Sequence, residues 1–270
     1  MALDKLTWSK TFSRREVPAF PCPGCRKATL KLDEKTLAVE ETERSKKNQK
    51  HEAWDPEWTE ERFSCLFRCD SAKCGEIVAV SGRVSVEQTF DDDEEIGWSY
   101  EGLLEPRSMY PPPPIIALPT NVPSPVREEL ELAFQFYWGD YGACANKIRT
   151  SVERLMDHFK VAKFRIAMDP KKPNLPGKMK PLDLAARIDK FISATGAAVH
   201  KDHLHALRIV GNLGTHNNVL SQTEILEAFE VYEHALEELI GKKSSQIGKL
   251  AKKLSKHAGK AKIEHSILGD

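Results

Sequence analysis

The sequence has no excess of either charge and no long apolar run. Its 40 Lys and Arg residues balance 40 Asp and Glu residues, so the formal net charge is +0. The chain therefore has no net positive charge that would indicate a nucleic-acid partner, and any nucleic-acid binding must come from local basic patches. No apolar run approaches the roughly 18 to 20 residues that span a bilayer. Residues 1–8 are polar and lack a signal-peptide core, so we expect a cytoplasmic protein with no membrane partner.

Cysteine is scarce, but four of the six cysteines form two short pairs, Pro21-Cys-Pro-Gly-Cys25 and Cys69-Asp-Ser-Ala-Lys-Cys-Gly75. A Cys-x-x-Cys turn directs two sulfurs to one point, as tetrahedral zinc requires. A cytosolic disulfide is disfavoured on redox grounds, and a thioredoxin-like pair needs a βαβ context that is missing here. We therefore predict a structural Zn²⁺ site whose ligands are Cys22, Cys25, Cys69 and Cys74.

The remaining cysteines have simpler interpretations. Cys65 lies on the alternating segment 62–68, which is typical of a strand, and we interpret it as a buried thiol. It is the alternative ligand if Cys69 is not used. Cys144 lies in a helical pattern and is interpreted as a small core residue.

Short segments of alternating polarity around the two cysteine pairs predict a small β module. We interpret 28–32 and 36–39 as a hairpin, 40–61 as a charged surface loop, and 76–80 with 83–86 as further strands. The acidic run 91–95 is expected to be a solvated turn. A module of this size has only a small hydrophobic core, and such modules are commonly stabilised by a structural metal. We expect removal of the metal to unfold the amino-terminal half of the chain.

The segment 106–125 is rich in proline, which excludes regular helix and central strand and favours an extended spacer across the surface. We place the domain boundary here. The predicted order is a zinc-ribbon-like β module over 1–105, a proline-rich linker over 106–125, a helical bundle over 126–241 and a lysine-rich tail over 242–270. The tail either contacts phosphates or forms a solvated terminal helix.

Helical periodicity then predicts an antiparallel bundle with short connections. The predicted helices are 125–137, 143–159, 182–194, 204–216 and 222–240, with a basic loop at 168–181. The fold class is therefore α+β, a small β module followed by an all-α bundle of four or five helices.

The helix predicted over 204–216 has a polar face. Arg208, Asn212 and His216 follow at intervals of four residues, so they can share one side of the helix, opposite an apolar stripe. An arginine, an amide and an imidazole would then line two turns. These three residues are the candidate catalytic set.

Four features together resemble the family known as domain of unknown function 4145, which is similar to the HEPN superfamily. They are the cysteine ribbon, the proline-rich segment 117–125, the helix with Arg149-Thr-Ser-Val-Glu153, and the segment Gly211-Asn-Leu-Gly-Thr-His216. The resemblance covers roughly residues 20–241. It implies a bundle of four or five helices that dimerises about a two-fold axis and brings one motif helix from each chain together.

Active HEPN members are metal-independent endoribonucleases, frequent in phage defence and toxin–antitoxin systems. Their motif is an arginine, a polar residue, and a histidine after four to six intervening positions. The histidine moves a proton while the arginine neutralises charge on the phosphoryl oxygens. Asn212 and His216 match the motif, but Gly211 takes the arginine position and Arg208 lies one turn earlier.

Gly211 and Gly214 act against a regular helix through this segment, since each glycine costs a helix about 1 kcal/mol relative to alanine. Gly214 is a candidate for the residue that ends the helix, which would leave His216 on a loop. Gly211 and Gly214 would also allow another helix to approach closely, which suits a dimer interface.

We expect a homodimeric module that binds nucleic acid or a nucleotide, with RNA or a defence-system protein as partner, in bacterial anti-phage defence. The alternatives are a metal-independent endoribonuclease using Arg208, Asn212 and His216, and a purely structural protein–protein adaptor.

Overall fold

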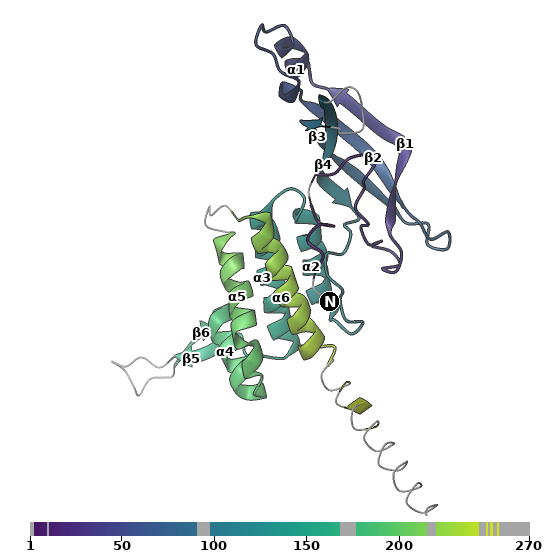
Figure 1. Cartoon of the computed structure of the whole chain (residues 1–270). Helices are drawn as coiled ribbons and strands as arrows, with labels where there is room; N and C mark the ends of the chain where they lie inside the picture. The colour runs from purple at the N-terminus through teal and green to yellow at the C-terminus, as the bar shows by residue number, and fades with distance from the viewer. Residues whose placement is uncertain are drawn as a thin grey trace, which may run out of the picture.

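The computed structural model describes residues 3–9, 11–90, 98–167, 177–214 and 220–242, with Ile247, Lys249, Leu250 and Lys253. The fold is α+β, as predicted: a four-stranded antiparallel sheet precedes the helices. Figure 1 shows the sheet to one side of the helices, near α2. The strands follow sequence order in the sheet and are β1 (Leu30–Glu41), β2 (Glu61–Cys69), β3 (Ile77–Phe90) and β4 (Trp98–Tyr110).

A single bulged strand replaces the hairpin predicted over 28–39. β1 pairs with β2 on both sides of a register shift between Asp33 and Ala38. Within the shift, Thr36 Oγ1 accepts a hydrogen bond from the Leu66 amide at 2.8 Å and donates one to the Asp33 carbonyl oxygen at 2.7 Å. These bonds satisfy backbone groups that the bulge removes from the ladder. The polar alternation is thus interrupted by a bulge, and the chain does not turn back.

The predicted surface loop 40–61 contains a short helix, α1 (Glu43–Asn48), and a 3₁₀ turn, η1 (Pro56–Trp58). The two segments predicted over 76–86 form one continuous strand, β3. The acidic run 91–95 lies outside the described residues.

β4 passes through Pro106, where the linker was predicted to start. Pro106 pairs with Gly82 next to a register shift, and β4 is an edge strand. Proline is tolerated there because an edge strand has a row of N–H groups without a ladder partner. Beyond the strand, Ile115, Ile116 and Val122 are buried. The proline-rich segment therefore packs onto the core and does not merely cross the surface, because its aliphatic side chains point inward.

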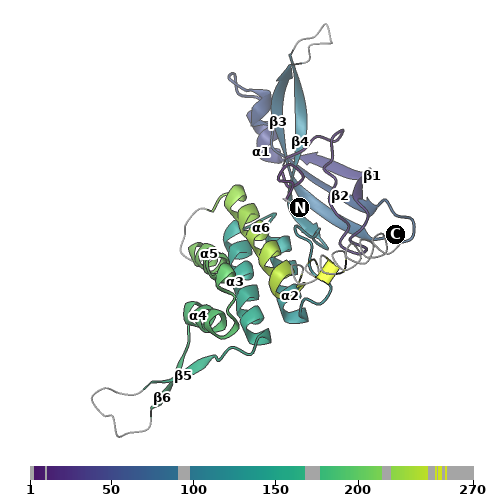
Figure 2. The ribbon, with the colours of Figure 1, turned by 60° about the horizontal axis from the view of Figure 1, so that its bottom comes forward.

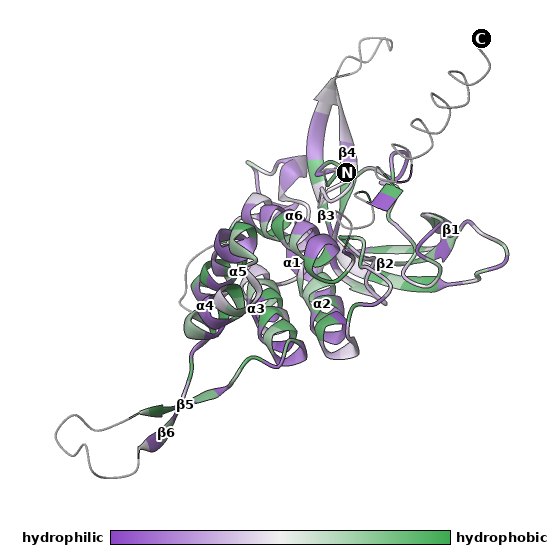
Figure 3. Ribbon diagram, turned by 90° about the horizontal axis from the view of Figure 1, so that it is seen from below, coloured by the Kyte–Doolittle hydropathy of each residue, from purple (hydrophilic) through white to green (hydrophobic). Residues whose placement is uncertain are grey.

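Five longer helices follow and are close to the predicted ranges. They are α2 (Ser124–Phe136), α3 (Tyr141–His158), α4 (Leu184–Thr195), α5 (Lys201–Leu213) and α6 (Gln222–Leu239), with a 3₁₀ turn, η2 (Ala198–His200), before α5. Hydrophobic and hydrophilic residues alternate around the helices in Figure 3. Across the described residues, no helix has the length and apolar character to cross a membrane.

A two-stranded hairpin between α3 and α4 was not predicted. It consists of β5 (Phe164–Ala167) and β6 (Lys178–Pro181), and it projects away from the helices in Figures 1 and 2. Residues 168–176, most of the predicted basic loop, lie outside the described residues.

The amino-terminal segment joins the sheet to the helices. Trp8 and Phe20 are buried, and the Phe20 ring lies 5.6 Å from that of Trp138, centroid to centroid. The Tyr137 hydroxyl donates a buried hydrogen bond to the Trp8 carbonyl oxygen at 2.6 Å. The sheet and the bundle consequently share one aromatic core.

Candidate metal centre and polar helix face

The two cysteine pairs meet at one end of the sheet. The sulfurs of Cys22, Cys25, Cys69 and Cys74 all lie within 4.8 Å of one another. The Cys22 and Cys74 sulfurs are 3.7 Å apart, and those of Cys25 and Cys69 are 3.8 Å apart. These are the four ligands predicted from the sequence, and the fold brings all of them together.

Backbone geometry holds each pair in a tight turn. The Arg26 amide donates to the Cys22 carbonyl oxygen at 2.9 Å, and Arg26 adopts a positive φ of 55°. In the second turn the Cys74 amide donates to the Ser71 carbonyl oxygen at 2.9 Å, and Gly75 has a φ of 69°. Glycine adopts this left-handed conformation without a Cβ penalty. The glycine that follows Cys74 in the sequence therefore has a conformational role.

Hydrogen bonding and burial act differently on the thiols. The backbone amides of Lys27 and Ala28 hydrogen-bond the Cys25 sulfur and lower the pKa of its thiol to about 6. Loss of solvation raises the pKa of Cys22. Four sulfurs at this separation repel one another when ionised, and a bound cation would offset that repulsion.

The donor set fits a four-coordinate thiolate site. Zinc–sulfur bonds of about 2.3 Å in a tetrahedron place the sulfurs about 3.8 Å apart. The Cys22–Cys74 and Cys25–Cys69 separations agree with that spacing. The described structure therefore contains a cysteine cluster whose dimensions are those of a tetrahedral metal site.

Cys65 and Cys144 lie outside the cluster. Both are buried, and burial raises the pKa of Cys65 to about 12. Between the two alternatives for the fourth ligand, the structure therefore places Cys69 in the cluster and Cys65 in the core of the sheet.

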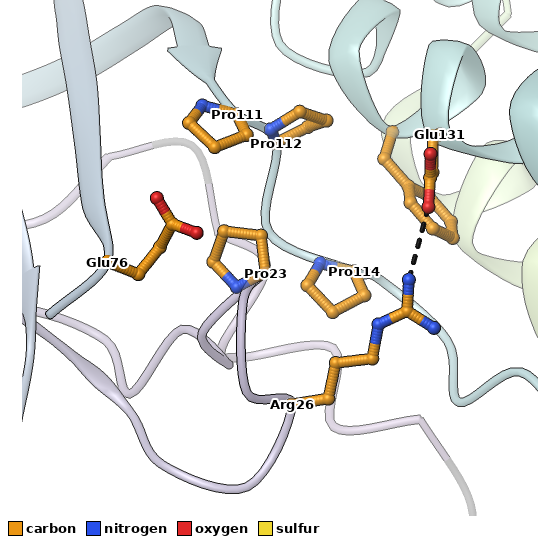
Figure 4. A pocket seen from close by; sticks show the side chains of 8 residues that line it. Pro23, Arg26, Glu76, Pro111, Pro112, Pro114 and Glu131 are labelled. Atoms are coloured by element: carbon orange, nitrogen blue, oxygen red, sulfur yellow. Dashed lines mark hydrogen bonds and ion pairs between the residues drawn. The ribbon is translucent and has the colours of Figure 1, made fainter. Parts of the chain in front are cut away.

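A proline-lined pocket lies beside the first cysteine turn and is shown in Figure 4. Pro23 and Arg26 come from that turn, and the segment after β4 supplies Pro111, Pro112 and Pro114. An ion pair of 3.1 Å between Arg26 Nη2 and Glu131 Oε1 connects the turn to α2. This ion pair connects the first cysteine turn to the helical bundle.

The polar face predicted on the fourth helix lies on α5. This helix ends at Leu213 and Gly214 is its C-cap, so the range 204–216 predicted for it is wrong at its carboxyl end, and the interpretation that Gly214 ends the helix is confirmed. Arg208 and Asn212 are both partly buried on α5. His216 lies outside the described residues. The Arg208 Nε atom is buried and donates no hydrogen bond within the part of the chain that is described.

Gly211 and Gly214 allow close packing of α5 on α3 of the same chain. A Cβ at Gly211 would collide with the Arg149 side chain and lie 2.9 Å from the Ala145 carbonyl oxygen. A Cβ at Gly214 would lie 2.5 Å from the Gly142 carbonyl oxygen. The helix that approaches the glycines is therefore α3.

Arg149 consequently fills the space next to Gly211, the residue that stands where the sequence comparison expects an arginine. Its Nη1 pairs with Glu153 at 2.9 Å, while its Nε is buried without a hydrogen bond among the described residues. Arg208 precedes Gly211 by three residues, the spacing of neighbours on one helix face. Arg149 of α3 thus lies against Gly211, and Arg208 lies one turn earlier on α5. Arg149 was not assigned to the site from the sequence, although a glycine within a helix is a signal that a neighbour lies close.

Residues 131–262 match the family model DUF4145. It is described as a domain of unknown function, and the match agrees with the resemblance drawn from the sequence for the helical part alone, because the cysteine ribbon lies outside it. Residues 10–109 match a second model, also a domain of unknown function, DUF8608. Searches of curated proteins and of solved structures return no match.

The DUF4145 region thus contains the polar face, and the DUF8608 region contains the cysteine cluster. Arg149 and Arg208 each have an Nε–H with no hydrogen bond among the described residues, and an arginine fork is suited to bind phosphate or carboxylate.

Proposed function

We propose that this chain is a zinc-binding protein whose helical part is HEPN-like and binds RNA or a nucleotide through its phosphates. The observation that supports this most is the pair of arginines at Gly211. Arg149 and Arg208 each keep a buried Nε without a hydrogen bond among the described residues. Leaving such a donor unsatisfied costs about 1–3 kcal/mol, and a bound phosphate would remove that cost.

Zinc in the cysteine cluster would stabilise the amino-terminal sheet. Four thiolates leave no open coordination position, so the metal has a structural role and takes no part in the chemistry at α5. Its place next to the Arg26–Glu131 ion pair would also fix the sheet against α2.

Homodimerisation through the bundle is part of the proposal, in line with the HEPN resemblance. Ile209 on α5 is 48% exposed, which is high for an isoleucine on a core helix. A second copy of α5 would cover it. Light scattering on Ile209→Glu should then report a monomer where the unmodified chain is a dimer. The biological setting that we propose is bacterial anti-phage defence in the cytoplasm, with RNA or a defence protein as partner.

A metal-independent endoribonuclease is the second candidate. It is favoured by the regular α5, which puts Arg208 and Asn212 on one face, and by Arg149, whose charge would replace the motif arginine missing at Gly211. In this case His216 would move a proton and the arginines would stabilise the phosphoryl oxygens. RNA cleavage by the purified chain without added metal, abolished in a folded His216→Ala variant, would support it. Equal cleavage by the two proteins would refute it.

RNA binding is tested by the salt dependence of affinity. Fluorescence anisotropy of a labelled single-stranded RNA, measured at several salt concentrations, gives a slope that becomes shallower by about 0.7 for each phosphate that the protein no longer neutralises. Arg208→Gln and Arg149→Gln should each weaken binding and flatten the slope. Arg154→Gln is the matched control, because Arg154 is an exposed residue of α3 that faces Glu129 and Asp157. Equal slopes for all proteins would reject phosphate binding at α5 and leave the structural adaptor.

A further inference from the structure

Three histidines gather at the opposite end of α5 from Gly211. One ring nitrogen from each of His200, His203 and His234 lies within 4.8 Å of the other two. The Nδ1 atoms of His200 and His203 are 3.4 Å apart, and the His203 and His234 ring centroids are 5.3 Å apart. Three imidazoles are therefore close enough to share one small ligand.

The fold constructs this cluster from segments that are separate in the sequence. His200 ends the η2 turn, His203 lies in the first turn of α5, and His234 lies on α6. His200 and His203 are partly buried, whereas His234 is exposed. Solvent therefore has access to the cluster from the α6 side. These residues form no recognisable ligand motif in the sequence, since His234 is distant from the other two in the chain.

Close packing of the three rings disfavours their protonated, positively charged forms. Burial, followed by the neighbouring His203 and His234, lowers the pKa of His200. The neutral imidazole, which is the form that binds metal ions, does not have this cost.

The dimensions fit a zinc ion. Zinc–nitrogen bonds of about 2.05 Å in a tetrahedron place the nitrogens about 3.3 Å apart. The His200–His203 separation of 3.4 Å is close to this value. Small rotations of the exposed His234 ring would bring the third nitrogen to the same distance.

We propose that His200, His203 and His234 form a second metal site, which binds Zn²⁺ and clamps the start of α5 to α6. Three nitrogen ligands leave the fourth position of the ion to water, unlike the closed four-thiolate site. The site lies apart from Arg208 and Asn212, and it does not depend on the function proposed for them. Because its ligands come from both helices, bound zinc stabilises the folded bundle by mass action.

Zinc stoichiometry tests the site directly. The full chain, without a polyhistidine tag and with reduced cysteines, is dialysed against micromolar free Zn²⁺, and bound zinc is measured by mass spectrometry. We expect two zinc ions per chain and a Tm that rises with added zinc. His234→Gln should bind one ion and show a smaller rise in Tm, which comes from the cysteine cluster alone. His203→Gln should do the same, and far-UV circular dichroism checks that both variants are folded.

Two further variants make the outcomes distinct. His158→Gln, an exposed histidine at the end of α3, controls for weak surface binding and should keep two ions. Cys69→Ser should lose only the thiolate-bound ion, and its remaining ion should disappear in the double variant with His234→Gln. If His234→Gln binds as much zinc as the unmodified chain, the histidine site is refuted, whatever the cysteine cluster binds.

Discussion

Arg149 on α3 lies directly over Gly211 on α5, in the space that any larger residue would need. A Cβ at position 211 would collide with the Arg149 Cβ and approach the Ala145 carbonyl oxygen to 2.9 Å. The two helices are therefore as close as glycine permits. The Arg149 guanidinium pairs with Glu153 of the same helix at 2.9 Å.

Replacing Gly211 with alanine should destabilise the protein. Alanine favours helix by about 1 kcal/mol over glycine, but the added methyl group must push α3 and α5 apart, which costs about 1–3 kcal/mol in a well-packed core. We expect the second effect to win, with a net loss of about 1 kcal/mol in the free energy of urea unfolding.

The matched control is Ala206→Gly on the exposed side of α5. It changes helix propensity alone and should cost about 1 kcal/mol. A more stable Gly211→Ala would contradict the close α3–α5 packing.

Hydrophobic periodicity in the sequence predicted the buried face of α5 but not which helix packs against it. The predicted apolar stripe begins with Leu204 and Leu207, which are buried, and continues with Val210 and Leu213, which are only partly buried. A single sequence does not tell which helix lies against Gly211, because that depends on how the bundle closes. In the sequence the glycine indicates that another helix can approach, and the structure identifies that helix as α3, which places Arg149 against Gly211.

The cysteine cluster was predictable because ligand spacing is local to each turn. The aromatic core was not. Trp8 stands alone in a polar segment without periodicity, so no pattern indicates that it packs between Phe20 and Trp138. The bulge in β1 was missed for a similar reason, since Thr36 makes it through a hydrogen bond to a different strand.

Substituting one clustered cysteine should remove the metal and unfold the sheet. Cys69→Ser leaves three thiolates, and the structural site is expected to lose its zinc together with the β-sheet amide protection measured by hydrogen exchange. Cys65→Ala is the control, because Cys65 is buried in the same strand but outside the cluster. It should retain zinc and lose only about 1 kcal/mol of stability. Zinc retained by Cys69→Ser at the level of the control would contradict the four-thiolate site.

Acid should weaken the contact between α3 and α4 through Asp157. Its carboxylate pairs with Arg187 at 2.6 Å and Lys163 at 2.9 Å. Partial burial acts to raise the pKa of Asp157, but hydrogen bonds from Lys163 and Arg187 outweigh it and lower the pKa. Stability from this group is therefore full above its unfolded pKa of about 4 and is lost as the pH falls through the lower folded pKa.

Asp157→Asn should remove this acid dependence. It leaves the buried Arg187 without its anion, and we expect a loss of about 2 kcal/mol at pH 7, less than for a fully buried pair. Urea unfolding between pH 7 and pH 3 should give a flatter stability profile for the variant. Asp189→Asn, whose carboxylate is half-exposed, is the control and should have a small effect. A variant with the same pH profile as the unmodified chain would exclude Asp157 as the source.

Removing Trp8 should uncouple the sheet from the bundle. The Trp8 side chain is 3% exposed and contacts rings from both parts, and its carbonyl oxygen accepts hydrogen bonds from Tyr137 and Gln222. Trp8→Ala creates a cavity and should cost about 3–5 kcal/mol. Tyr137→Phe, which removes one hydroxyl and retains the ring packing, should cost only about 1 kcal/mol.

Thermal unfolding followed by helical circular dichroism and by hydrogen exchange of sheet amides distinguishes these cases. The unmodified chain and Tyr137→Phe should unfold in one transition by both measurements, because the shared core couples the two parts. Trp8→Ala should separate them, with the sheet unfolding at the lower temperature, since it has the smaller core of its own. Coincident transitions in Trp8→Ala would mean that the remaining contacts, such as the one between Phe20 and Trp138, are enough to couple the sheet to the helices.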